Sequence, residues 1–158
     1  MVNAVAILSQ SAAITGMINF TQPHPGAQTT VTAKIHGLEP GKHGIHVHSL
    51  GDISGGCNST GTHWNPRNMT HGGPNDEIRH AGDFGNVVAD ANGDVCVKLH
   101  DDVATLFGPE SILGRAIVIH ALEDDLGRGG NAESKSTGNA GGRLACGIIG
   151  ISSLEDLD

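Results

Sequence analysis

Short segments in which apolar and polar residues alternate recur along the whole chain, separated by turns rich in glycine or proline. In one of them Val31, Ala33 and Ile35 alternate with polar residues. A period of two is typical of a β-strand with one buried face. We therefore expect eight strands, at residues 4–8, 14–20, 31–36, 42–48, 83–89, 95–100, 115–122 and 143–151.

The number of glycines supports an all-β fold. The chain has 24 glycines in 158 residues, which disfavours long helices, and we expect no helix of ten or more residues. Eight short strands with turn signals between them predict an antiparallel sandwich or barrel in a single domain, residues 1–158. We expect the acidic tail, residues 152–158, to be frayed. Residues 50–82 and 123–142 form two unusually long loops, and long ordered loops are usually functional.

Charge and hydropathy limit the partners of the chain. The net charge of −8 argues against binding to nucleic acid or to an anionic membrane. There is no apolar run of the roughly 18 residues that a membrane span requires. The first residues lack the positive charge of a signal peptide, so we expect a cytoplasmic protein.

Histidine is concentrated in one part of the sequence. Residues 44–83 contain five of the ten histidines, and these are His46, His48, His63, His71 and His80. Asp83 ends this stretch and His120 follows later. In a strand, His46 and His48 would project from the same face, while residues 45 and 47 would face the core. Neutral imidazole is the commonest transition-metal ligand, so the cluster predicts a metal site for more than one ion. We expect the remaining histidines to be ordinary surface or hydrogen-bonded residues; these are His24, His36, His43 and His100.

Five sequence motifs make the chain recognisable. They are Gly44-Ile45-His46-Val47-His48, His63-Trp64-Asn65-Pro66, His71-Gly72-Gly73-Pro74, Arg79-His80-Ala81-Gly82-Asp83 and Gly138-Asn139-Ala140-Gly141-Gly142-Arg143-Leu144-Ala145-Cys146-Gly147. Along nearly its whole length the chain resembles the copper/zinc superoxide dismutases, of the cytosolic type. The resemblance implies a Greek-key, immunoglobulin-like barrel with two functional loops. It also implies an antioxidant enzyme that converts superoxide to dioxygen and hydrogen peroxide by alternate reduction and reoxidation of copper.

The resemblance also implies one copper ion and one structural zinc ion per subunit. It assigns copper to His46, His48, His63 and His120. It assigns zinc to His63, His71, His80 and Asp83, with His63 bridging the two ions as an imidazolate. Four imidazoles suit Cu(II), and three imidazoles with one carboxylate suit a closed zinc site.

Residues of the second loop would control access to copper. By resemblance, Arg143 guides superoxide, Asp124 links ligands of both metals from behind, and Thr137, Lys135 and Glu133 belong to the channel. Two positions depart from the family pattern, because Ser136 replaces a common lysine and Ala132 replaces a frequent acid. We expect Lys135 to replace the missing lysine in part.

The three cysteines allow two interpretations. A cytoplasmic location alone favours free thiols, whereas the resemblance implies a disulfide between Cys57 and Cys146. Cys96 alternates with Val95 and Val97, so we expect an exposed free thiol there.

The resemblance further implies a homodimer and possible loading by a copper chaperone. The dimer contacts would be Val5, Ile7, Leu50, Gly51, Ile53, Gly114, Ile148 and Ile151. An alternative is a non-enzymatic copper carrier or structural zinc domain, but the chain has no paired cysteine motif for Cu(I) and keeps every copper ligand of the pattern. Residues 129–136 also resemble a phosphate-binding loop weakly, but Ser134 stands where that motif needs glycine.

Overall fold

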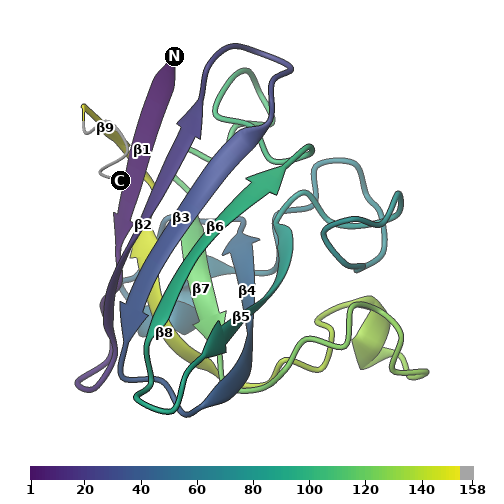
Figure 1. The fold of residues 1–158 in the computed structure, drawn as a ribbon. Helices are drawn as coiled ribbons and strands as arrows, with labels where there is room; N and C mark the ends of the chain where they lie inside the picture. The colour runs from purple at the N-terminus through teal and green to yellow at the C-terminus, as the bar shows by residue number, and fades with distance from the viewer. Residues whose placement is uncertain (154–158) are drawn as a thin grey trace.

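The computed structural model describes residues 1–153, which form two antiparallel sheets packed face to face (Figure 1). The strands are β1 (Val2–Ile7), β2 (Thr15–Gln22), β3 (Thr29–His36), β4 (Gly41–His48), β5 (Asp83–Ala89), β6 (Val95–Asp101), β7 (Ala116–His120), β8 (Arg143–Ile148) and β9 (Gly150–Ser152). Within this range the only helical segments are two 3₁₀ turns, η1 (Gly56–Thr60) and η2 (Glu133–Lys135). The absence of a long helix agrees with the glycine content. The last five residues of the expected frayed tail, 154–158, lie outside the described residues.

The strand order confirms the Greek-key sandwich. One sheet has the order β6-β3-β2-β1-β9 and the other the order β5-β4-β7-β8. The connections from β3 to β4 and from β6 to β7 pass from one sheet to the other, so strands distant in sequence become neighbours. Within the described residues, no helix is long and apolar enough to cross a bilayer.

The expected eighth strand, residues 143–151, is wrong as a single element. It divides at Ile149 into β8, which pairs with β7 in one sheet, and β9, which pairs with β1 in the other. Ile149 is fully buried at the crossing, where its amide N–H donates to the carbonyl of Arg115. The chain therefore changes layer within an uninterrupted apolar run, and nine strands form instead of eight.

The alternating residues fill the space between the sheets. Ile18 and Phe20 from one sheet and Ile45 and Val47 from the other are fully buried. All five residues of β7 are also buried, because its second face is covered by the long loops rather than by solvent. The outer face of the four-stranded sheet is thus a second buried region, and the histidines lie there.

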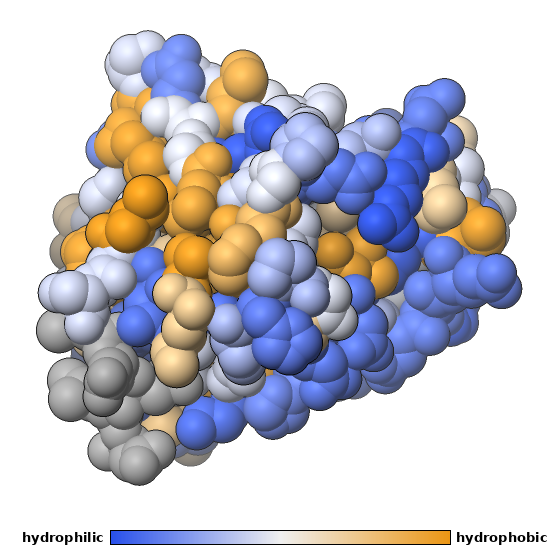
Figure 2. Space-filling view, turned by 90° about the horizontal axis from the view of Figure 1, so that it is seen from above, coloured by the Kyte–Doolittle hydropathy of each residue, from blue (hydrophilic) through white to orange (hydrophobic). Residues whose placement is uncertain are grey.

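The disulfide expected between Cys57 and Cys146 is present and fastens the first long loop to β8. The two cysteines are 89 residues apart, and closing a loop of that length contributes roughly 4–5 kcal/mol in the chain-entropy model. Cys96 is an exposed free thiol, as the alternation predicted. Both long loops extend from the same side of the barrel (Figure 1), and that side of the surface is mostly hydrophilic (Figure 2).

Candidate metal centre

Two strands and one loop bring four imidazoles together outside the four-stranded sheet. β4 and β7 pair so that His46 lies opposite Val118, and both His46 and His48 point away from the core. A register shift at the end of β7 brings His120 beside them. His63 comes from the first long loop through a bridge to His48, and its ring stacks on that of His46 with the centroids 3.9 Å apart.

Hydrogen bonds fix which nitrogen of each ring is free. The Nδ1–H groups of His48 and His120 donate to the carbonyls of Gly61 (2.8 Å) and Gly141 (3.1 Å), which leaves each Nε2 with a lone pair. His46 has the opposite arrangement: Nε2 bonds to Asp124 at 2.5 Å, while its Nδ1 is buried with no hydrogen-bond partner. Possible ligand atoms of His46, His48, His63 and His120 lie within 4.8 Å of one another. An unpartnered buried nitrogen among other free lone pairs fits a cation site.

A second group of ligand atoms surrounds one oxygen of Asp83. Its Oδ1 lies 3.1 Å from Nδ1 of His63, 3.0 Å from Nδ1 of His71 and 3.3 Å from Nδ1 of His80. The other oxygen, Oδ2, accepts the amide N–H groups of Gly72 and His80. Nδ1 of His71 makes no geometrically acceptable hydrogen bond despite this proximity. The crowding of lone pairs around one point again fits a cation.

Five residues offer ligand atoms to this second group: His46, His63, His71, His80 and Asp83. A set of four ligand atoms within 4.8 Å contains His46, His63, His71 and Asp83 without His80. However, Nδ1 of His80 lies only 3.2 Å from Nδ1 of His63. His46 has a single free nitrogen, which can serve only one ion. Either grouping contains His63, so the two cation sites are adjacent and share its ring.

Asp124 connects the two groups from behind. Its Oδ2 bonds Nε2 of His46, and its Oδ1 accepts Nε2–H of His71 at 2.8 Å. Asn86 on β5 holds the Asp124 backbone through two hydrogen bonds, one to the amide and one to the carbonyl. A carboxylate in this position orients both imidazoles and increases their basicity.

Burial keeps the imidazoles of the first group in the neutral form that binds a cation. It lowers the pKa of His46 to about 3, of His48 to about 2 and of His120 to about 4, so these rings are neutral at pH 7. Burial also lowers the pKa of His71, but the hydrogen bond with Asp124 and the nearby carboxylate of Asp83 outweigh it and raise that pKa to about 9. In the metal-free protein His71 is therefore a positively charged imidazolium at pH 7. A cation that binds its Nδ1 would displace the proton from that nitrogen.

Three residues of the first group, His48, His63 and His120, line a cavity of about 780 Å³. Arg143 lies on its wall, where Nη1 donates to the carbonyl of Cys57 (3.0 Å) and to Oγ1 of Thr60 (3.2 Å). The second loop contributes Glu133, Lys135 and Thr137 to the lining. The structure thus places every predicted channel residue at the same opening.

The other histidines are separate from the centre. His24, His36 and His100 are exposed, and His36 pairs with Asp94. His43 is buried, with its two ring nitrogens beside the carbonyls of Glu39 and His120. None of these four belongs to a candidate metal group within residues 1–153.

Several residues that support the site were not predicted from the sequence. Asn86 holds Asp124, and a buried ion pair between Arg79 and Asp101 holds the backbone next to His80. Arg79 lies within a recognised motif, but neither Asn86 nor Asp101 has a local signal, since each partner comes from a distant part of the chain.

Two adjacent groups of candidate ligand atoms that have His63 in common, on the outer face of an antiparallel sandwich, define a metalloprotein with a two-metal centre. The family model for copper/zinc superoxide dismutase (SODC) matches residues 14–149. The chain belongs to the copper/zinc superoxide dismutase family. It is therefore an oxidoreductase of a family that uses copper and zinc and acts on superoxide.

Proposed function

We propose that this chain dismutes superoxide at copper bound by His46, His48, His63 and His120, with zinc bound by His63, His71, His80 and Asp83. The single observation that carries the proposal is the pair of adjacent donor groups that share His63. Nδ1 of His63 faces Asp83 and His80, which leaves Nε2 for the first group. The free Nδ1 of His46 completes that group, so His80 is the fourth residue of the other.

The chemistry of the donors favours this distribution of metals. Four neutral imidazoles suit Cu(II), whereas three imidazoles and one carboxylate form a closed set typical of structural zinc. Copper supplies a one-electron acceptor and donor, so that one superoxide is oxidised to dioxygen and a second is reduced and takes up two protons. His63 lies on the cavity floor, where its Nε2 can hold a proton and pass it to the reduced oxygen.

Arg143 accounts for the attraction of an anion to an acidic protein. One unit charge at about 5 Å attracts superoxide by about 3 kcal/mol at an effective dielectric constant of 20. The net charge of −8 is spread over the surface, and salt screens charges beyond about 8–10 Å. We assign Lys135 a smaller part in steering, with Glu133 opposing it and Thr137 narrowing the channel.

Metal loading combined with a superoxide assay tests the proposal. Protein loaded with copper and zinc should consume superoxide and form one peroxide for every two superoxide ions. Removal of copper by a chelator should abolish consumption, and addition of copper should restore it. A fully copper-loaded protein that leaves superoxide decay at the spontaneous rate would favour the copper-carrier alternative.

We further propose a cytoplasmic antioxidant enzyme of the cytosolic type, formed by residues 1–158 as one domain and loaded with metal by a copper chaperone. We also propose a homodimer through apolar residues near β1, β8 and β9. Ile7, Leu50, Ile148 and Ile151 are exposed, and these support the proposal. Val5, Gly51, Ile53 and Gly114 would complete the contact.

Sedimentation velocity at micromolar concentration tests the dimer. We expect a dimer for the parent chain and a monomer for Ile151→Lys, because a charge at this exposed apolar position would oppose burial. Sedimentation of the parent chain as a monomer would reject the dimer.

A further inference from the structure

We propose that the cavity lined by His48, His63 and His120 also binds small organic monocarboxylates that have an apolar body, in competition with superoxide. The carboxylate would bind Arg143, and the body would lie against Met69 and Leu122. The location relative to copper rests on the proposed function. The binding itself depends only on residues of the cavity wall.

The cavity is much larger than the substrate requires. Its volume is about 780 Å³, within the range of about 300–1,000 Å³ typical of sites for organic ligands. A two-atom anion fills only a small part of such a space. The remainder of the wall can therefore contact a second, larger kind of ligand.

Arg143 provides a fixed anchor for a carboxylate. The hydrogen bonds of its Nη1 to Cys57 and Thr60 hold the guanidinium at the cavity wall. Among residues 1–153, its Nε and Nη2 make no hydrogen bond, so these donors remain available. A guanidinium binds a planar carboxylate through two parallel hydrogen bonds, which a two-atom anion cannot match in geometry.

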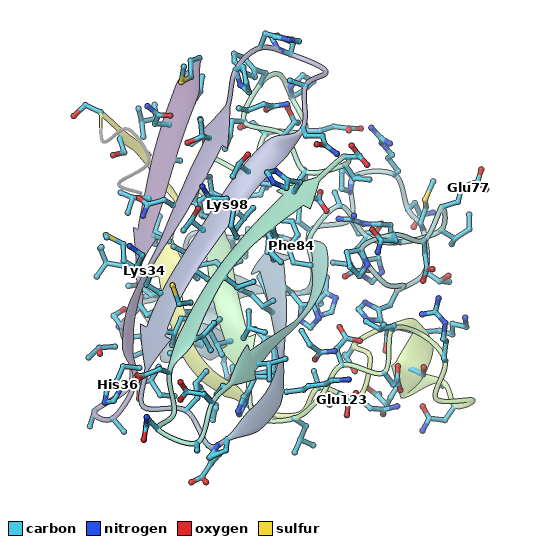
Figure 3. All side chains as sticks on the ribbon, in the orientation of Figure 1. Lys34, His36, Glu77, Phe84, Lys98 and Glu123 are labelled. Atoms are coloured by element: carbon cyan, nitrogen blue, oxygen red, sulfur yellow. A yellow bond between two sulfur atoms is a disulfide. The ribbon has the colours of Figure 1, made fainter. Side chains whose placement is uncertain are left out.

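Two apolar side chains from different loops line the same cavity. Leu122 is 57% exposed, and its flank is open because its neighbour Gly141 has no side chain. Leu122 directly precedes Glu123, which Figure 3 labels where the second long loop begins. Met69 comes from the first long loop, where both its amide and its carbonyl bond to the side chain of Asn65. Exposed apolar surface at a concave site is a common feature of ligand pockets.

The charges of the wall favour a single carboxylate. Glu133 also lines the cavity, where its Oε2 accepts a hydrogen bond from Oγ1 of Thr137 at 3.2 Å. Lys135 lines the cavity as well, and its charge offsets that of Glu133. Arg143 thus leaves these three side chains with one net positive charge, which matches a ligand with one negative charge. The expected ligand class is therefore a monoanion with an apolar chain or ring, such as hexanoate.

Comparison of hexanoate with acetate separates the contribution of Arg143 to binding from that of the apolar side chains. Each fully buried methylene strengthens binding about fourfold, and burial of half of the four additional methylenes gives about fifteenfold. We therefore expect hexanoate to inhibit the holoenzyme competitively about fifteenfold more strongly than acetate, and 1-hexanol to inhibit weakly. Equal inhibition constants for hexanoate and acetate, or noncompetitive inhibition, would overturn the proposal.

A pair of variants locates the apolar contact. Leu122→Ser should weaken hexanoate inhibition about fivefold and leave acetate inhibition unchanged. Val88→Ser is the matched control, because Val88 on β5 is also exposed, at 61%, but does not line the cavity. Equal effects of the two substitutions on hexanoate would overturn the proposal.

Direct binding distinguishes this inference from the proposed function. Ligand-observed NMR on zinc-loaded, copper-free protein should show a lower dissociation constant for hexanoate than for acetate. Leu122→Ser should raise the dissociation constant of hexanoate about fivefold, as it raises the inhibition constant. This result would support the carboxylate site even if the copper-loaded protein failed to consume superoxide. If the protein dismutes superoxide but does not bind hexanoate, the proposed carboxylate site would be overturned and the proposed function would stand.

Discussion

Asp124→Asn is expected to lower the affinity for zinc about 10- to 100-fold, the usual effect of removing a residue that orients a metal ligand. The two oxygens of Asp124 bond Nε2 of His46 and Nε2 of His71. An amide has only one oxygen, so its NH₂ group would face one of the two ring N–H groups. That imidazole would lose both its orientation and the negative charge that strengthens it as a ligand.

Competition with a chelator of known zinc affinity measures this loss. Glu123→Gln is the matched control, because Glu123 is the adjacent acid, is exposed and, among residues 1–153, its carboxylate bonds only to Lys42. We expect the control to bind zinc like the parent chain. Zinc binding by Asp124→Asn at the parent affinity would show that the link to His46 and His71 does not hold the ligands in place. The thermal unfolding of the zinc-free variants shows whether the fold itself has changed.

The sequence predicted the strands best where one face is buried and the other is exposed. β3 and β6 lie close to their expected ranges, because the pleat of a half-buried strand leaves a clear alternation. β7 is shorter than expected and is buried on both faces, so the polarity of its residues does not mark where it ends. The division at Ile149 has no local signal, because the change of sheet is a property of the pairing partners.

The candidate site was predictable to the extent that its residues are close in sequence or recognisable as motifs. The pair His46 and His48 follows from the period of a strand. The hydrogen bonds of Asn86 to Asp124 join residues 38 positions apart, and no spacing rule relates them. Sequence patterns thus identified the ligands, whereas most of the residues that hold those ligands became visible only in the folded chain.

Asp101→Asn is expected to destabilise the metal-free protein by about 3–5 kcal/mol, the usual effect of removing one partner from a buried ion pair. Nη1 of Arg79 lies 2.7 Å from Oδ1 of Asp101, and both side chains are buried. Asp101 also accepts the amide N–H groups of Val103 and Ala104. The substitution would leave the guanidinium buried without a counter-charge.

Denaturant unfolding of the metal-free protein measures the change in free energy, with Asp102→Asn as the matched control. Asp102 is exposed, and within the described part of the chain its carboxylate bonds only to Gln28, so we expect the control to unfold like the parent chain. Arg79 also donates to the carbonyl of His80, next to the proposed zinc ligand ring. Loss of Asp101 should therefore also speed the release of zinc to a chelator. Unchanged stability would mean that the ion pair contributes no net free energy to folding. Lowered stability with an unchanged rate of zinc release would mean that the ion pair supports the fold but does not position His80.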